Sequence, residues 1–567
     1  MMKKLGLTVI AAAVIAGGVY INQTQTSGSG ILAQVPADTV FFAAQVTPFP
    51  LRAQLEQYSA PLMSEQELAM MKQELEEVTQ PSARFLMSWF IHYAETLTSP
   101  DRFIEDYGLA DEVTGYTYAL GMIPVLKSSL AHPDKLFATL DGFEQQSGQS
   151  HEVRTLGDRQ ARVYPLDLDD TGEVIELWVA HHQGELTLTL GAPFVGEAQI
   201  KQALGVTQPA NSLADSGEVA EIKKRNGFSS DNLGFINHKQ LVTGLFSQDG
   251  NEFARQLTKL IDNPSEVVSF RNSECLNEWS AIAGNWSRTS FENDYRLESG
   301  KLAMEGQMVV ESNNGVIIDA LTQMRGFLPD LGQGADGPLL SAALGINADN
   351  LQASLTTIRN QWLEQEYQCQ ALGEIQDELK MMPPETLGLF AGFTDGVQGI
   401  SLSIFDYALD QQGMSNEMLK SVDMLMSFSA KDPGKIIATG AAAFPPLAEV
   451  NVAPGEKKQM DQVMGQPLPQ TMTVEQAGEH LLIYSGAKSE AVARNLASQP
   501  ANPNGLFSMV MDYRRALEPM MQLLSAIEPE AAAELATYSE MDARLIMEMD
   551  VDSRGLVLSY DQQPTQR

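Results

Sequence analysis

Histidine and serine are the residue types in this sequence that could do chemistry, as general base and nucleophile. No two of the seven histidines lie four residues apart and no His-Glu-x-x-His motif is present, so a helical zinc site is not indicated. No Gly-x-Ser-x-Gly elbow presents a serine, and neither cysteine has a natural histidine partner in sequence. We therefore assign no catalytic, cofactor-binding or metal-ligating residue. The histidines are His92, His132, His151, His181, His182, His238 and His480.

The best metal candidate is the acidic segment from Asp167 to Glu173. Asp167, Asp169 and Thr171 take the first, third and fifth positions of a calcium-binding loop. The twelfth position is Trp178, where such a loop needs a bidentate glutamate. We expect an acidic turn here and no bound ion.

Cys275 and Cys369 are the only two cysteines. Neither lies in a Cys-x-x-Cys motif or beside the cationic residues that lower a thiol pKa, so a reactive pair is the less favoured interpretation. In an exported protein they most simply form one disulfide. It would close a loop of about 95 residues, worth roughly 4–5 kcal/mol in the chain-entropy model.

Methionine is frequent, with 26 residues that cluster in stretches such as Met424 to Met426 and Met520 to Met521. The adaptable thioether fills irregular cores, and this is the commonest reason for such clusters. It also suits a groove that accepts apolar ligands or partner helices. Copper ligation is a third interpretation, although it favours regularly spaced methionines.

The N-terminus predicts export. Lys3 and Lys4 precede an apolar run from Leu5 to Ile21, and a polar spacer follows as far as residue 30. The 17-residue run is at the short limit for a membrane-spanning helix, so it fits an uncleaved inner-membrane anchor or a cleaved signal peptide. Either interpretation predicts a periplasmic protein, anchored by residues 5–21 or released after cleavage.

The chain is long and strongly acidic. Its 567 residues favour two to four domains, and 44% hydrophobic residues are enough for a buried core. The formal net charge of −36 repels nucleic acid and anionic lipid headgroups, so we expect neither as a partner. Solubility is the simplest reason for this charge, and capture of a cationic partner is the alternative.

Two pairs of similar stretches indicate an internal repeat. The stretch "VPADTVFF", Val35 to Phe42, resembles "MPPETLGLF", Met382 to Phe390. The stretch "HPDKLFAT" from His132 aligns without gaps to "DPGKIIAT" from Asp432, with four identical positions. Proline keeps the preceding residue extended, and an acidic residue before threonine offers turn hydrogen bonds. Each opening stretch therefore predicts the start of a first strand.

The rest of the pattern is compatible with this repeat. Hairpins predicted at 177–191 and 472–486 are each followed by a short amphipathic helix, and strands lead into helices capped by Asn237 and Asp512. Tight hairpins favour antiparallel pairing. We predict an α+β fold: two related modules of antiparallel sheet with packed helices, an internal duplication, after the N-terminal apolar segment. The predicted divisions are 1–30 (signal or anchor with spacer), 31–320 (first module), 321–378 (helical connector) and 379–567 (second module).

The start "ILAQVPADTVFFAAQVTPFPL" resembles a family of uncharacterised exported envelope proteins of Gram-negative bacteria, in which a Val-Pro-Ala-Asp-Thr phrase precedes the first strand of a domain of unknown function. The specific resemblance covers about 20 residues. It implies an envelope location and a duplicated α+β architecture, and it brings no catalytic residues. The missing motifs favour a non-enzymatic envelope protein that binds another envelope protein or an apolar ligand. The alternative is an envelope hydrolase with a site at the module interface.

Overall fold

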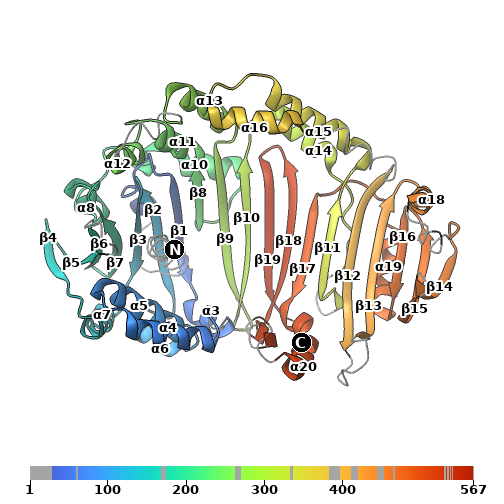
Figure 1. The fold of residues 1–567 in the computed structure, drawn as a ribbon, viewed down its shortest axis with the longest axis horizontal. Helices are drawn as coiled ribbons and strands as arrows, with labels where there is room; N and C mark the ends of the chain where they lie inside the picture. Colours follow the sequence, from blue (N-terminus) through green and yellow to red (C-terminus); the bar gives the residue numbers. More distant parts are fainter. Residues whose placement is uncertain are drawn as a thin grey trace. The chain divides into compact units, whose positions relative to one another are not determined.

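The computed structural model describes residues 28–565 with several gaps, and strands and helices alternate along them (Figure 1). The predicted N-terminal apolar run, the calcium-like loop beyond Asp167 and the stretch "MPPETLGLF" lie outside the described residues. The gaps are 59–61, 168–173, 262–269, 333–335, 382–395, 410–418, 444–447, 449–451, 464–465, 529–530, 533–534, 537 and 539–540.

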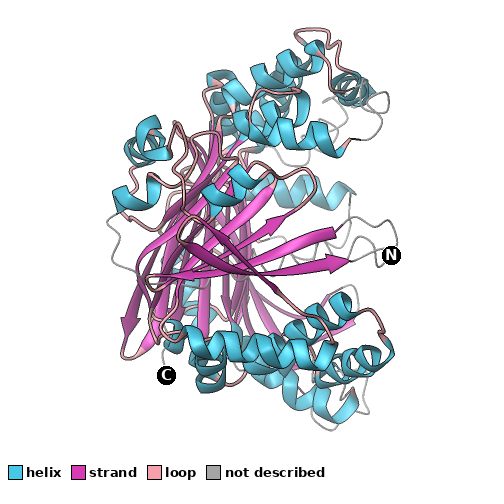
Figure 2. Cartoon of the chain, turned by 90° about the vertical axis from the view of Figure 1, so that its left-hand side faces the viewer, coloured by secondary structure: helices cyan, strands magenta, loops and turns pink. Residues whose placement is uncertain are grey.

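The chain forms two compact units, which meet in sequence between Leu302 and Ala303. Each contains helices and antiparallel strands, so the predicted mixture of helix with antiparallel sheet is confirmed. Figure 2 distinguishes the helices from the strands by colour. The sequence-based divisions at residues 320 and 378 fall elsewhere. Unit 1 denotes the residues up to Leu302, and unit 2 those from Ala303.

Unit 1 contains an antiparallel sheet in the order β9-β8-β1-β2-β3-β7-β6-β5-β4. Its strands are β1 (Phe41–Phe49), β2 (Val113–Leu120), β3 (Ile123–Ser129), β4 (Glu152–Leu156), β5 (Arg159–Asp167), β6 (Val174–His182), β7 (Glu185–Gly191), β8 (Leu233–Asn237) and β9 (Arg288–Glu298). Its helices are α2 (Gly28–Leu32), α3 (Leu51–Gln57), α4 (Glu65–Glu77), α5 (Pro81–Thr96), α6 (Pro100–Asp106), α7 (Pro133–Ser147), α8 (Glu197–Ala203), α9 (Leu213–Ser216), α10 (Glu218–Asn226), α11 (His238–Phe246), α12 (Glu252–Leu260) and α13 (Ser273–Asn285).

Unit 2 contains an antiparallel sheet in the order β10-β19-β18-β17-β11-β12-β13-β16-β15-β14 (Figure 1). Its strands are β10 (Lys301–Glu311), β11 (Leu340–Gly345), β12 (Val397–Leu409), β13 (Leu419–Ala430), β14 (Lys457–Val463), β15 (Gln466–Ala477), β16 (His480–Ser485), β17 (Phe507–Asp512), β18 (Ala543–Asp552) and β19 (Gly555–Pro564). Its helices include α14 (Gly315–Met324), α15 (Ala348–Leu363), α16 (Gln370–Met381), α18 (Pro433–Ala443), α19 (Ala487–Leu496) and α20 (Tyr513–Ile527).

The segment 321–378, predicted as a helical connector, differs from that prediction. It supplies β11 to the middle of the unit 2 sheet as well as α15 and α16. The stretch from Pro338 does have the pattern of a strand that runs into a helix, as at Asn237 and Asp512, and β11 followed by α15 agrees with that pattern.

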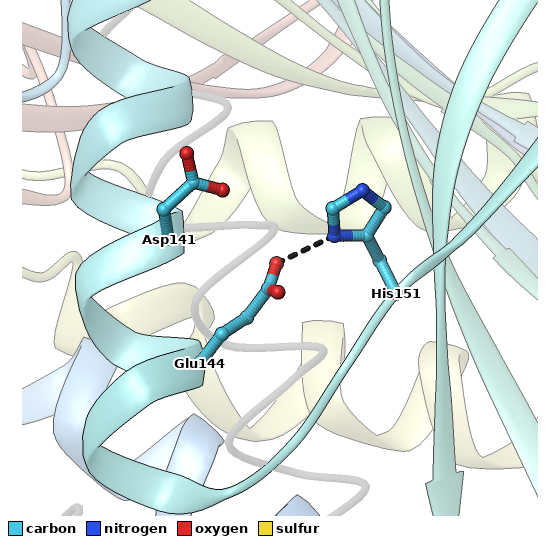
Figure 3. A group of neighbouring side chains, drawn as sticks. All are labelled: Asp141, Glu144 and His151. Atoms are coloured by element: carbon cyan, nitrogen blue, oxygen red, sulfur yellow. Dashed lines mark hydrogen bonds and ion pairs between the residues drawn. The ribbon is translucent and has the colours of Figure 1, made fainter.

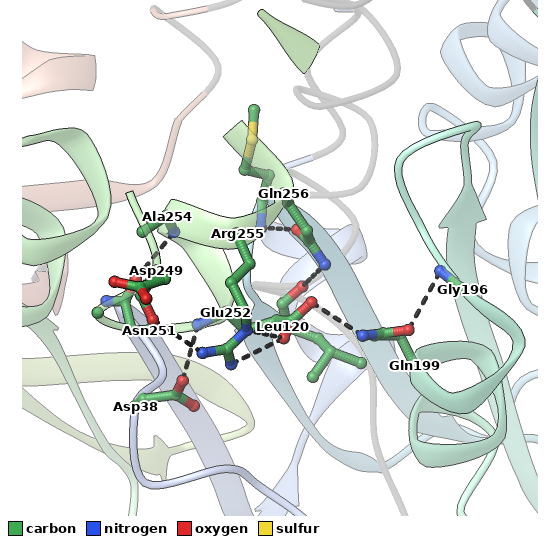
Figure 4. A network of polar contacts seen from close by, with 12 residues as sticks. Asp38, Leu120, Gly196, Gln199, Asp249, Asn251, Glu252, Ala254, Arg255 and Gln256 are labelled. Carbon is green, nitrogen blue, oxygen red and sulfur yellow. Dashed lines mark hydrogen bonds and ion pairs between the residues drawn. The ribbon is translucent and has the colours of Figure 1, made fainter. Parts of the chain in front are cut away.

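The Val-Pro-Ala-Asp-Thr phrase leads into a strand, as predicted. The Thr39 N–H closes a local turn by donating to the Pro36 carbonyl at 3.1 Å, and the Asp38 and Thr39 side chains bond to segments far away in the sequence. The Thr39 hydroxyl donates to the Ala119 carbonyl at 2.8 Å, and β1 begins two residues later. Asp38 accepts from the backbone N–H of Glu252 at 3.0 Å, at the first residue of α12 (Figure 4). Since Val35 is fully buried, the phrase fixes where the chain enters the sheet.

The local predictions that follow are also confirmed. Strands β6 and β7 form the first predicted hairpin, with Gln183 and Gly184 at positive φ in the turn, and β15 and β16 form the second. Asn237 caps α11 by accepting from Gln240, and Asp512 caps α20 by accepting from Arg515. Both cysteines are buried and disulfide-bonded; since the sequence holds no third cysteine, the predicted pair of Cys275 and Cys369 is formed.

Candidate functional site

One face of the unit 2 sheet carries large apolar side chains in register across five neighbouring strands. In the row that runs through Leu344, Phe507 is paired on one side and Ile400 on the other. Two further rows run through Ala342 and Leu340. We call this set the methionine face: Leu340, Ala342, Leu344, Ile400, Leu402, Ile404, Met424, Met426, Phe428, Phe507, Met509, Met511, Leu545, Met547 and Met549.

The methionine face is partly open to solvent: five of its residues are exposed and the other ten are half-buried. None of its fifteen residues is buried, and Leu344 and Leu402 are 47% and 45% exposed. No member of the set is charged. Single exposed apolar residues are normal on a protein, but a contiguous apolar patch marks an interaction site or an aggregation hazard. This surface is therefore the strongest candidate for function in the described part of unit 2.

On β11, β12 and β13 the opposite face is core, and this explains the sequence alternation of these three strands. Serines there hydrogen-bond in buried pairs, Ser341 to Ser403 at 2.9 Å and Ser401 to Ser427 at 2.7 Å. Leu425, which pairs with Ser403 on this face, is fully buried with Leu496 of α19. Because side chains alternate along a strand, fixing the serines inward turns the large apolar residues outward.

Helix α18 reaches only the margin of the methionine face. Ile437 packs with Leu481 and Val474, and Phe428 is partly buried against this cluster. Phe428 pairs directly with Leu481 of β16, so the part of the sheet that α18 covers begins at β16. The rows on β11, β12, β17 and β18 keep their exposure beyond that margin.

His480 and Ser429 are the pair in unit 2 that most resembles a general base with a nucleophile. Ser429 Oγ lies 2.9 Å from His480 Nδ1, and Nε2 lies 2.8 Å from the Gln499 carbonyl oxygen. Burial lowers the pKa of His480, so the ring is neutral near pH 7. Both side chains are at most 1% exposed, so a substrate cannot reach the hydroxyl. The pair satisfies buried polar groups and does not form an active site.

Asp141, Glu144 and His151 come together in unit 1 although the sequence offers no ligand spacing there (Figure 3). Their ligand atoms lie within 4.8 Å of one another, but each carboxylate already has a partner. Arg162 Nη1 lies 2.5 Å from Asp141, and Glu144 Oε1 lies 2.6 Å from His151 Nδ1. A cation would have to compete with the guanidinium of Arg162. The cluster is an internal ion-pair network.

The remaining histidines also have structural partners in the described chain. His92 lies 3.0 Å from Asp106, and His182 lies 2.7 Å from Arg159. His238 lies 2.8 Å from the Trp286 carbonyl oxygen, and His181 accepts from the Gly184 N–H. His132 differs from these, since it is the N-cap residue directly before α7 and its side chain makes no capping hydrogen bond.

Lys127 is a buried cation in unit 1 that sequence reasoning does not single out. Its ammonium lies 2.8 Å from Glu185 and donates to Gln34 at 3.2 Å, and only 2% of the residue is exposed. The Tyr116 hydroxyl donates to the same Gln34 oxygen. The alternating strand pattern gives no signal here, because a lysine in a strand normally faces solvent. This cluster is a satisfied polar interior beside a small pocket.

Comparison with protein-family models, curated proteins and solved structures finds no match. Among the described residues, none of the helices combines the length and apolar character needed to cross a bilayer.

Proposed function

We propose that this chain is a non-enzymatic exported envelope protein that binds another envelope protein through the methionine face. The supporting observation is the apolar surface of fifteen residues in unit 2, none of them buried and five of them exposed. Fully burying one leucine or methionine side chain yields about 1.5–3 kcal/mol, so covering a few of these side chains supports specific binding. Methionine adapts to the shape of its partner.

The proposed location is the periplasm, with the N-terminal segment either retained as an inner-membrane anchor or cleaved. Lys3 and Lys4 before the apolar run support export. The disulfide supports it independently, since disulfides persist in oxidising compartments.

We further propose that the two units are copies of one ancestral domain. The order β8-β1-β2-β3-β7-β6-β5 in unit 1 has the same sequence of connections as β17-β11-β12-β13-β16-β15-β14 in unit 2. The aligned stretches at Pro133 and Pro433 begin α7 and α18, which directly follow the corresponding strands β3 and β13. In this scheme the second copy starts at β11, ahead of Pro383.

The alternative of an envelope hydrolase has less support. Its best pair among the described residues, Ser429 with His480, is closed to solvent. The Asp141 cluster is saturated by Arg162 and Tyr164.

Site-specific photocrosslinking in intact cells tests the proposed function. A photoreactive residue at Leu402 should give a discrete adduct with one envelope protein, whereas the same residue at Val153, which is 56% exposed in unit 1, should not. The adduct should disappear when Leu344→Asn is added. Adducts at both positions, or at neither, would contradict binding through the methionine face.

A further inference from the structure

The methionine face is neutral although the unit around it is strongly acidic. Residues 303–567 contain 15 Lys and Arg and 35 Asp and Glu, a formal charge of 15 − 35 = −20. Exposed acidic residues occur on the same strands, with Asp406 on β12 and with Glu548 on the side of β18 opposite to Met547 and Met549. An uncharged apolar area in such a field favours a partner that is apolar on one side and cationic on the other.

The methionine face also restricts the backbone conformation that a partner segment can adopt. Its strands β11, β12, β13, β17 and β18 all have hydrogen-bonded neighbours on both sides, so none of these five strands offers a free edge. A partner segment lying on side chains receives no backbone hydrogen bonds from the sheet. Its own N–H and C=O groups must then be satisfied within the segment, as they are in a helix.

The dimensions agree with one helix. Five strands at about 4.8 Å spacing span about 19 Å, and three rows two residues apart span about 14 Å. A helix of about 13 residues is about 20 Å long, with a diameter of about 10–12 Å including side chains. Such a helix would lie across the strands and present apolar residues at i, i+3, i+4 and i+7.

We infer that the occupant of the methionine face is a cationic amphipathic helix of a partner protein. This inference rests on the proposed function and names the class of partner. A second copy of the chain is disfavoured because each copy carries −36 charges. A lipid is disfavoured because an open sheet face does not enclose an acyl chain.

Model peptides test this class directly with the full chain. The probes are an 18-residue amphipathic Leu/Lys peptide, the same peptide with Glu for Lys, and a scrambled Leu/Lys peptide. Fluorescence anisotropy should give a dissociation constant for the Leu/Lys helix at least tenfold lower than for either control, and the affinity should fall with salt. The variant Leu344→Asn/Leu402→Asn should weaken binding by about tenfold or more.

Matched controls separate this class from general attraction to an acidic protein. Val153→Asn, at an exposed site in unit 1, should leave the affinity unchanged. Circular dichroism checks that each variant is folded, and the single Leu402→Asn variant replaces the double one if the latter unfolds. The inference would be overturned if the Glu peptide bound equally well, or if Val153→Asn weakened binding as much as the variant of the face. It would also be overturned if the protein floated with neutral phosphatidylcholine vesicles in place of binding peptide, or if it formed a dimer that Leu402→Asn abolished. If no peptide binds while the Leu402 photoadduct persists, the partner class is wrong and the proposed function stands.

Discussion

The two sheets follow the same strand order but differ in what one face carries. With Pro133 and Pro433 aligned, Leu126 corresponds to Met426, and their strand partners Thr117 and Leu402 correspond in turn. Leu126 and Thr117 are buried in unit 1, whereas Leu402 is 45% exposed in unit 2. Leu402 is therefore both larger and more exposed than Thr117, its counterpart in unit 1.

The helices explain the burial in unit 1. Leu126 belongs to a core cluster with Phe85 of α5 and Leu140 of α7, so the face lies under helices. In the described part of unit 2, α18 reaches only the margin near Leu481. A sheet face without a partner would be expected to carry polar residues where helices do not cover it. Unit 2 does the opposite, which is why its open face is the better candidate for binding.

The buried polar residues of the two units differ as well. Substituting them is expected to give the largest change in the free energy of unfolding. Lys127 and Glu185 in unit 1 correspond to Ser427 and His480 in unit 2. Lys127→Ala leaves Glu185 without its buried cation and should lower the free energy of unfolding by about 3–5 kcal/mol. Ser427→Ala should cost about 1 kcal/mol, as for one neutral hydrogen bond. Urea unfolding measures both; equal losses would remove the contrast between the two interiors.

The contrast in helix cover predicts the next largest effect. Leu126→Ala removes a side chain that is 2% exposed and should cost about 3 kcal/mol through the cavity left under α5 and α7. Met426→Ala, at the corresponding position, should cost less than about 1 kcal/mol because its side chain is only partly buried. Chemical denaturation of both variants tests this. A large loss for Met426→Ala would mean that the face is covered in the folded protein.

Much of the fold could be predicted from local signals. The start at Pro36, the hairpin at Gln183 and Gly184, and the caps Asn237 and Asp512 depend on turn chemistry, which acts over a few residues. The role of β11 could not be, because a six-residue strand gains its place from pairing with β17, more than 160 residues away. The methionine clusters indicate a core or a groove, but which face is covered depends on where distant helices pack.

The pH dependence of stability that His480 gives to unit 2 is a smaller effect. Burial lowers the pKa of His480, so the folded protein disfavours its charged form. The unfolded chain takes up a proton near pH 6.5, so the stability from a neutral His480 is full above that pH and is lost as the pH falls. His480→Gln should therefore reduce the slope of stability between about pH 6.5 and 5. Unchanged slopes in pH-dependent urea unfolding would show that His480 is not held neutral.

The smallest effect on stability is expected on the methionine face itself, and it is the most informative. Leu402→Asn replaces a side chain that is nearly half exposed, so the free energy of unfolding should change by about 0.5 kcal/mol or less. The same substitution should reduce the fluorescence of an apolar dye bound to the folded protein. Leu126→Asn is the matched control and should unfold the protein, because it places an amide in a dry core. If Leu402→Asn were equally damaging, the open face would be core and the difference between the units would disappear. Tolerance of asparagine together with loss of dye binding would mean that these side chains are retained for contact with another molecule and not for folding.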